Sequence, residues 1–301
     1  MARLGGTGRS DGADRRTDGA RALPPGLHFV ATPIGAARDV TLRALDILGQ
    51  ADVLAAEDTR SLRHLMEIHG IALGGRPLLA YHDHNGEAVR PRLLGALAEG
   101  RSVAYASEAG TPLVADPGYQ LARAAIGAGH AVLSAPGPSA VLAALTVSGL
   151  PSDRFLFAGF PPAAAGARKA FLAELAGVPA TLILYESPKR VGRLLREMAD
   201  ALGDRPACVC RELTKRFEEV TRGTLADLAA AFGERAVKGE VVVLADRARA
   251  APDRGDRLEG TLREALARLP VSKAAAEVAM VLGLPRREVY QAALRLSGDG
   301  G

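Results

Sequence analysis

Between residues 27 and 138, short apolar segments alternate with segments of helical periodicity, and this alternation constrains the fold more than any other feature. Residues 102–106, Ser-Val-Ala-Tyr-Ala, are typical of a buried strand, whereas residues 41–50 place three leucines on one face of a helix. Such alternation predicts a mostly parallel sheet with helices on both faces. The predicted strands are 27–31, 53–56, 78–81, 102–106 and 130–134.

A second set of strands and helices follows from about residue 155, so we predict an α/β fold class with two α/β domains. The last predicted helices, around Gly283-Leu284-Pro285, form in outline either a helix-turn-helix or a plain helical hairpin used for packing. The predicted regions are a disordered Gly- and Arg-rich arm (1–26), an N-terminal α/β domain (27–138), a C-terminal α/β domain (139–247) and a small C-terminal helical segment (258–297).

Composition limits the compartment and the partners. No stretch of about 20 apolar residues is present, and the start of the chain lacks the apolar core of a signal peptide, so we expect no membrane span. The two cysteines, Cys208 and Cys210, fit buried free thiols in a reducing cytoplasm. The net charge of +4 is compatible with an RNA partner, but an Arg-rich coding bias explains it equally well.

Polar or Gly/Pro-rich residues follow each predicted strand of the first domain. The carboxyl ends of parallel strands meet at one edge of a sheet, where open α/β sheets bind their ligands. We therefore expect the functional site at this edge. The segments are Thr32–Gly35, Glu57–Arg60, His82–Asn85, Ser107–Pro112 and Pro136–Ser139.

Several common kinds of site are missing from the sequence. There is no Walker A loop, no glycine fingerprint of a dinucleotide fold and no nucleophile elbow, which argues against a P-loop NTPase, a dinucleotide oxidoreductase and a Ser hydrolase. His82 and His84 have a spacing seen in some metal sites, but two histidines alone are a weak signal. We therefore expect no bound metal.

Nine motifs occur in the order found in one known family. On these motifs the chain resembles the tetrapyrrole methylase superfamily, and within it the enzymes that methylate a cytidine ribose of 16S rRNA. The resemblance extends from about Leu27 to the C-terminal helices. The motifs are Thr32–Gly35, Ala55–Arg60, His82–Asn85, Ser107–Pro112, Asp116–Gly118, Pro136–Ala140, Gly149–Phe155, Tyr185–Arg190 and Arg211–Lys215.

The resemblance implies S-adenosyl-L-methionine as methyl donor, bound in a cleft between the two domains. It also implies a homodimer that acts in the cytoplasm on 16S rRNA of the small ribosomal subunit, at a decoding-region cytidine. By motif match, the residues facing the donor are Pro33, Gly35, Glu108, Ala109, Gly110, Thr111, Pro112, Pro138, Tyr185 and Glu186. The family usually has Asp at Glu108 and often has Asn-Leu at Ala36-Ala37, so these two contacts differ here.

Methyl transfer to a ribose hydroxyl needs alignment of donor and acceptor and a group that accepts the hydroxyl proton. The candidates are Asp58 and Glu57, aided by Arg60 or Lys215. The alternative for Glu57-Asp58 is an N-cap with a charge in the first helical turn. Nearby cations either contact RNA phosphate or pair with Glu212, Glu218 or Glu219; they are Arg190, Arg211, Lys215 and Arg216.

Two other functions compete with RNA methylation. A methyltransferase for a small tetrapyrrole would share fold and donor, but it would have no need of a basic helical tail. A non-catalytic RNA-binding protein would have no need of a complete set of polar strand ends. Donor binding separates the second alternative from the enzymes.

Overall fold

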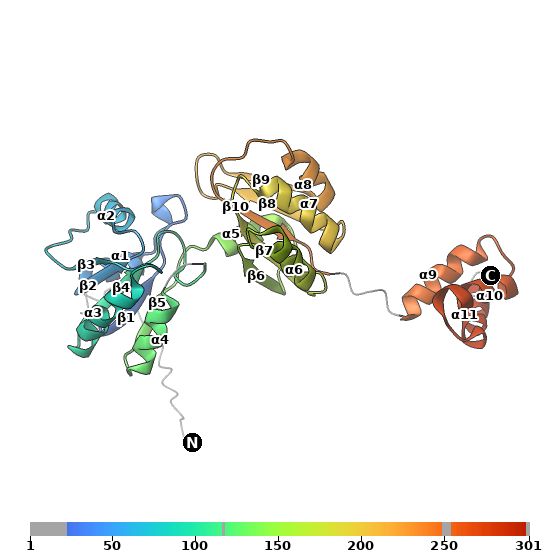
Figure 1. Cartoon of the computed structure of the whole chain (residues 1–301), viewed down its shortest axis with the longest axis horizontal. Helices are drawn as coiled ribbons and strands as arrows, with labels where there is room; N and C mark the ends of the chain where they lie inside the picture. The colour runs from blue at the N-terminus through green and yellow to red at the C-terminus, as the bar shows by residue number, and fades with distance from the viewer. Residues whose placement is uncertain (1–22, 116–117, 249–253, 299–301) are drawn as a thin grey trace, which may run out of the picture.

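The computed structural model describes residues 23–115, 118–248 and 254–298, which form two α/β parts and a group of C-terminal helices (Figure 1). The first part contains a sheet of five parallel strands in the order β3-β2-β4-β1-β5, as the alternation predicts. Its strands are β1 (Gly26–Val30), β2 (Val53–Ala56), β3 (Leu78–Ala80), β4 (Ser102–Ala106) and β5 (Val132–Ala135). The predicted arm lies outside the described residues except for its last four, and β1 already begins at Gly26.

Helices cover both faces of this sheet, because successive side chains of a strand point to opposite sides. Tyr105 of β4 packs in one core with Leu93 and Leu121, whereas its neighbours Ala104 and Ala106 belong to a core on the other face. The helical elements are the 3₁₀ turn η1 (Ala37–Asp39), α1 (Leu42–Gln50), α2 (Thr59–Ile68), α3 (Gly86–Ala98) and α4 (Tyr119–Gly127).

The second sheet has the order β6-β7-β10-β8-β9 and is mostly antiparallel; only β6 and β7 pair in parallel. Its strands are β6 (Phe155–Gly159), β7 (Thr181–Glu186), β8 (Pro206–Arg211), β9 (Glu219–Thr224) and β10 (Val241–Ala245). The sequence analysis missed β9, because this edge strand reads Glu-Val-Thr-Arg-Gly-Thr and has no apolar run.

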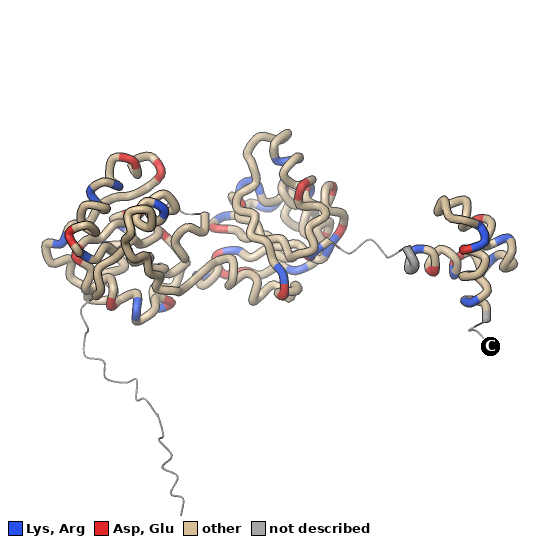
Figure 2. Tube along the Cα trace, turned by 90° about the horizontal axis from the view of Figure 1, so that it is seen from below, with Lys and Arg blue, Asp and Glu red and all other residues tan. Residues whose placement is uncertain are grey.

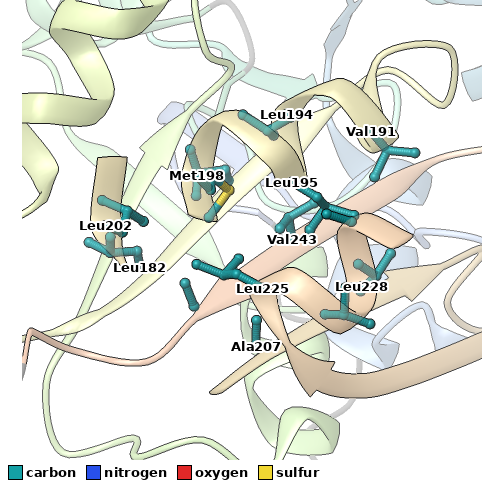
Figure 3. Close-up of a cluster of buried hydrophobic side chains, with 14 of the residues drawn as sticks. Leu182, Val191, Leu194, Leu195, Met198, Leu202, Ala207, Leu225, Leu228 and Val243 are labelled. Carbon is teal, nitrogen blue, oxygen red and sulfur yellow. The ribbon is translucent and has the colours of Figure 1, made fainter. Parts of the chain in front are cut away.

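Two layers of helices also enclose the second sheet. The larger core lies between one face and α6 (Ala165–Leu175), α7 (Val191–Leu202) and α8 (Leu225–Phe232), where Leu195, Met198 and Val243 are buried (Figure 3). On the other face, α5 (Ala140–Ser148) covers Cys208 and Cys210. Both cysteines are buried and free, with their Sγ atoms 3.7 Å apart, which confirms the predicted buried thiols.

The C-terminal helices α9 (Arg254–Leu266), α10 (Val271–Leu282) and α11 (Arg286–Gly298) have a small core of their own, which includes Leu262, Val278 and Val289. Helix α9 begins before residue 258, the predicted start of the tail. The prediction places the start too late because the first turn of α9 has the charged composition of a linker. Basic and acidic residues are interspersed along both α/β parts and these helices (Figure 2). In the described part of the chain, no helix is long and apolar enough to cross a membrane.

Gly192 allows α7 and α8 to approach closely, and we expect Gly192→Ala to lower the free energy of unfolding by about 2–3 kcal/mol. A Cβ at this position would lie 2.4 Å from the carbonyl oxygen of Phe232, so the two helices would have to separate. The control is Gly95→Ala in α3, where a Cβ meets nothing within 4 Å. This control should be stabilising by about 0.5–1 kcal/mol. Equal urea unfolding midpoints for the two variants would contradict the prediction.

Candidate active site

A cavity of about 470 Å³ lies between the two sheets, at the carboxyl edge of the first one. Its walls come from the segments after β1, β2, β4, β6 and β7, from the start of α5 and from the start of β10. The lining residues are Ile34, Glu57, Glu108–Thr111, Val114, Ala115, Ser139, Ala140, Phe160, Tyr185–Pro188 and Gly239–Val242. The predicted donor residues Glu108, Ala109, Gly110, Thr111, Tyr185 and Glu186 line it, whereas Pro33, Gly35, Pro112 and Pro138 lie outside the lining.

On the first wall, the loops after β1 and β4 are hydrogen-bonded to each other. Thr32 and Gly110 exchange both backbone hydrogen bonds, at 2.9 and 3.0 Å, and the buried Ser107 hydroxyl donates to the Gly110 carbonyl at 2.6 Å. Gly110 has a φ of +83°, which favours glycine. The Thr111 hydroxyl donates to the Pro138 carbonyl at 2.9 Å, so Pro138 supports the wall from behind.

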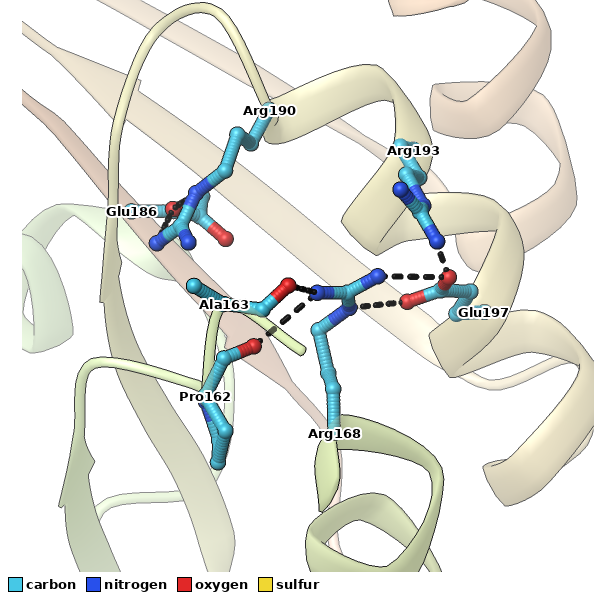
Figure 4. Close-up of polar contacts among 7 residues, drawn as sticks. All are labelled: Pro162, Ala163, Arg168, Glu186, Arg190, Arg193 and Glu197. Atoms are coloured by element: carbon cyan, nitrogen blue, oxygen red, sulfur yellow. Dashed lines mark hydrogen bonds and ion pairs between the residues drawn. The ribbon is translucent and has the colours of Figure 1, made fainter. Parts of the chain in front are cut away.

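On the second wall, Glu186 presents a carboxylate oxygen without a protein partner. Its Oε1 accepts hydrogen bonds from the backbone N–H of Ser187 at 2.6 Å and from Nε of Arg190 at 2.7 Å (Figure 4). Its Oε2 is buried and has no hydrogen-bond partner in the structure, and the side chain is only 1% exposed. A buried polar atom left unpaired costs about 1–3 kcal/mol, so this oxygen indicates a ligand that brings an N–H or O–H group.

A buried arginine and its partly exposed carboxylate partner hold the aromatic side of the same wall. The Arg168 guanidinium donates to the carbonyls of Pro162 and Ala163, at 2.9 and 2.7 Å, and pairs with Glu197 (Figure 4). These contacts hold the segment after β6, which carries Phe160. The ring of Phe160 lies 5.5 Å from that of Tyr185, and burial raises the pKa of Tyr185 to about 12, which keeps its phenol neutral.

The cavity has an acidic lining. Four glutamates contribute to it, namely Glu57, Glu108, Glu186 and Glu240, and none of the described lining residues is Lys or Arg. Burial raises the pKa of Glu108, and the negative charges of Glu57, Asp58 and Glu240 raise it further. A lining of this kind favours a ligand with positive charge, because the ligand relieves the repulsion among the carboxylates.

The two adjacent carboxylates after β2 have different surroundings. Asp58 is the N-cap of α2, and its Oδ1 accepts hydrogen bonds from the backbone N–H groups of Arg60 and Ser61, at 2.7 and 3.4 Å. Its Oδ2 lies 2.8 Å from the Arg60 guanidinium, and the hydrogen bonds from this side chain, together with those from the two backbone N–H groups, lower the pKa of Asp58 to about 2. Glu57 instead lines the cavity, where its Oε2 accepts from the Glu108 N–H at 3.4 Å. The N-cap alternative therefore describes Asp58, and Glu57 is the carboxylate available to a ligand.

Lys215 lies outside the lining but contacts a residue that belongs to it. Its Nζ is 3.0 Å from Oε1 of Glu212 and 2.8 Å from Oε2 of Glu240. Burial acts to lower the pKa of Lys215, but the hydrogen bonds that it donates to Glu240 and Glu212 outweigh this effect, so the pKa is raised. Lys215 therefore stays protonated and provides a fixed positive charge beside the acidic cavity.

Gly35 allows the two parts to approach closely beside this lysine. A Cβ at Gly35 would lie 2.6 Å from both Cγ of Lys215 and Oγ1 of Thr214. The same Thr214 hydroxyl accepts a hydrogen bond from the backbone N–H of Ala36 at 3.1 Å. Gly35 therefore allows the loop after β1 to contact the β8–β9 loop, which closes one side of the site.

The sequence analysis missed two prominent lining residues, Glu240 and Phe160. The predicted site residues lie at or after the ends of strands, whereas Glu240 precedes one. Strand β10 runs antiparallel to β7 and pairs Val241 with Glu186, which brings the start of β10 to the cavity. Phe160 directly follows β6, which is parallel to β7, so the strand-end argument could have found it. The rings of His82 and His84 lie 5.9 Å apart, and the described residues contain no group of three or more His, Cys, Asp or Glu that could hold a metal.

Comparison with known proteins identifies the relatives of this fold and site. The model of the tetrapyrrole (corrin/porphyrin) methylases matches residues 26–229, and that of the RsmI C-terminal HTH domain matches residues 251–297. The chain is 49% identical to "Ribosomal RNA small subunit methyltransferase I" of Mesorhizobium japonicum, over 94% of this chain and 97% of that protein. It is 46% identical to the protein of the same name from Xylella fastidiosa strain Temecula1, over 89% and 99% of the two chains.

Solved structures show the same fold at lower identity. A cobalt precorrin-4 methyltransferase of cobalamin biosynthesis superposes with a TM-score of 0.55 at 20% identity, covering 73% of this chain and 94% of the other. The matched family model covers the first sheet and the second part of the chain as far as α8, without β10, and the close relatives extend over nearly the whole chain. The chain therefore belongs to the tetrapyrrole (corrin/porphyrin) methylase family, and it is a methyltransferase.

Proposed function

We propose that this enzyme uses S-adenosyl-L-methionine to methylate the ribose 2′-oxygen of a cytidine in the decoding region of 16S rRNA. The proposed substrate is the small ribosomal subunit, and the proposed working form is a homodimer in the cytoplasm. The observation that carries the proposal is the 49% identity to a ribosomal RNA small subunit methyltransferase over 94% of this chain. The finer assignment to the ribose of a cytidine is what the family resemblance of the sequence motifs implies, and it is part of the proposal.

The residues of the cavity fit this methyl donor. The volume of about 470 Å³ falls within the range of about 300–1,000 Å³ typical of pockets for small molecules. The donor is a sulfonium with an ammonium group, and when bound it supplies the methyl group. The acidic lining suits these charges, and Oε2 of Glu186 supplies an acceptor for an N–H or O–H of the donor. The backbone of Ala109 and Gly110 completes the proposed donor site.

We assign the proton transfer to Glu57. Glu57 lines the cavity, and its carboxylate would take the proton of the ribose 2′-hydroxyl. The donor would supply the methyl group to that oxygen, with its carbon–sulfur bond broken and a neutral thioether left. Asp58 and Arg60 lie outside the cavity and pair with each other. We assign them a positioning role, because this pair fixes the start of α2, directly after Glu57. Lys215 offsets the negative charge of Glu212 and Glu240 on the side where RNA would enter.

Transfer of label from tritiated S-adenosylmethionine tests this function. We expect label in the 16S rRNA of purified small ribosomal subunits, and no label when the target ribose is 2′-deoxy. A small tetrapyrrole offered in parallel should remain unlabelled. Label in the tetrapyrrole alone would contradict the proposed substrate and leave the methyltransferase activity in place.

A further inference from the structure

The loop between β8 and β9 exposes an aromatic ring at the edge of the site. Phe217 is 62% exposed, which makes it the most exposed Phe or Tyr among the described residues. The guanidinium carbon of Arg216 lies 5.5 Å from the centre of this ring, a cation–π distance. A single exposed apolar side chain is common on protein surfaces, so its place in the fold decides whether it has a role.

Hydrogen bonds hold the backbone on both sides of these two residues. The backbone N–H of Thr214 donates to Oε2 of Glu218 at 2.6 Å, and the N–H of Glu218 donates to the Lys215 carbonyl at 3.1 Å. Thr214 has a φ of 62°, a left-handed conformation that costs free energy in a β-branched residue. The loop is therefore held in one shape, and it presents Arg216 and Phe217 without a large loss of conformational entropy on binding.

The loop also adjoins the proposed active site. Lys215, the residue before Arg216, contacts Glu240 of the cavity lining at 2.8 Å. Thr214 contacts the loop after β1 through the N–H of Ala36 at 3.1 Å. Arg216 and Phe217 therefore directly follow two residues that contact the cavity lining and the loop after β1.

We propose that Phe217 is a stacking platform for a nucleobase next to the methylated nucleotide, with Arg216 adding a positive charge toward the RNA backbone. This inference rests on the proposed RNA substrate. Unpaired bases bind proteins by stacking on aromatic rings and arginine planes, and arginine also contacts phosphate. The residues beside the ring, Arg216 and Glu218, are exposed and charged, so the ring is not part of a contiguous apolar protein interface.

Steady-state labelling of small ribosomal subunits by Phe217→Ala and Phe217→Trp tests the platform. We expect Phe217→Ala to raise KM for the subunits about tenfold, which corresponds to the loss of one stacked base. Phe217→Trp should restore the wild-type KM, and the Kd of S-adenosylmethionine should be the same in all three proteins. The control is Ile126→Ala at the end of α4, where a side chain of 63% exposure should be removed without effect on KM.

Three results would overturn the inference. The first is an unchanged KM for Phe217→Ala, and the second is a Trp variant as impaired as the Ala variant, which would indicate packing rather than stacking. The third is an oligomeric state of Phe217→Ala that differs from that of the wild type in sedimentation velocity, which would place Phe217 in a protein interface. A wild-type enzyme that labels no RNA would instead refute the proposed function itself, so the two failures are distinguishable.

Discussion

Replacing Glu57 by Gln should lower kcat for ribose methylation by about 100-fold or more, which is the usual contribution of a general base. The amide has the shape of the carboxylate but cannot accept the hydroxyl proton. Donor binding should change little by comparison, since Glu57 is one of four carboxylates in the lining. Single-turnover kinetics with saturating donor and subunits measure the chemical step directly, and calorimetry measures the Kd of the donor.

Asp58→Asn is the matched control, because it makes the same chemical change one residue away. Asn is as good an N-cap as Asp, so α2 should form normally, and we expect kcat to fall less than about tenfold. The pKa of Asp58 is about 2, below its ordinary value of 3.8, so its carboxylate stays ionised above about pH 4. Stability contributed by that charge is present above pH 3.8 and is lost as pH falls through 2. The pH profile of kcat should therefore be unchanged in this variant. If Asp58→Asn loses as much activity as Glu57→Gln, the proton acceptor is Asp58.

The first sheet could be predicted from the sequence because its three central strands, β1, β2 and β4, are buried on both faces and its strands end in clear loops. The apolar runs at 53–56 and 102–106 correspond to β2 and β4 without change. The second sheet was harder to predict, because apolar periodicity does not report strand direction. The segment Glu219–Thr224 lacks the apolar pattern altogether, and its membership of the sheet depends on pairing with β8, a contact that no local signal encodes.

The same difference explains which site residues could be predicted. The loop with Glu108 and Gly110 follows the parallel strand β4, so its place at the sheet edge follows from topology alone. Glu240 precedes its strand and reaches the cavity only because β10 is antiparallel to β7. The hydrogen-bond partners of the two carboxylates after β2 could not be predicted from the sequence either. From the sequence, the adjacent carboxylates of Glu57 and Asp58 are equally good candidates for the proton acceptor. The structure distinguishes them, because Asp58 pairs with Arg60 whereas Glu57 lines the cavity.

Glu186→Gln should weaken binding of S-adenosylmethionine by roughly 10- to 150-fold, the range for one hydrogen bond to a charged group of about 1.5–3 kcal/mol. The amide oxygen can still accept from the N–H of Ser187, which keeps the turn after β7. The amide nitrogen then takes the place of Oε2 and offers N–H groups where the carboxylate offers an acceptor. An N–H or O–H group of the methyl donor therefore loses its hydrogen-bond partner. The negative charge that favours the cationic methyl donor is lost as well. Calorimetric titration of the donor measures the effect.

Glu259→Gln separates the loss of an acceptor in the cavity from the loss of an ion pair. Glu259 pairs with Arg263 at the same i, i+4 spacing that joins Glu186 to Arg190, but on helix α9 and with 43% of its side chain exposed. This control should leave the donor Kd and the melting temperature unchanged, since exposed pairs contribute little. A folded Glu186→Gln variant with wild-type donor affinity would show that Oε2 binds no part of the donor. The unpaired oxygen would then have to serve the acceptor nucleotide, and the defect would appear in KM for the small ribosomal subunit instead.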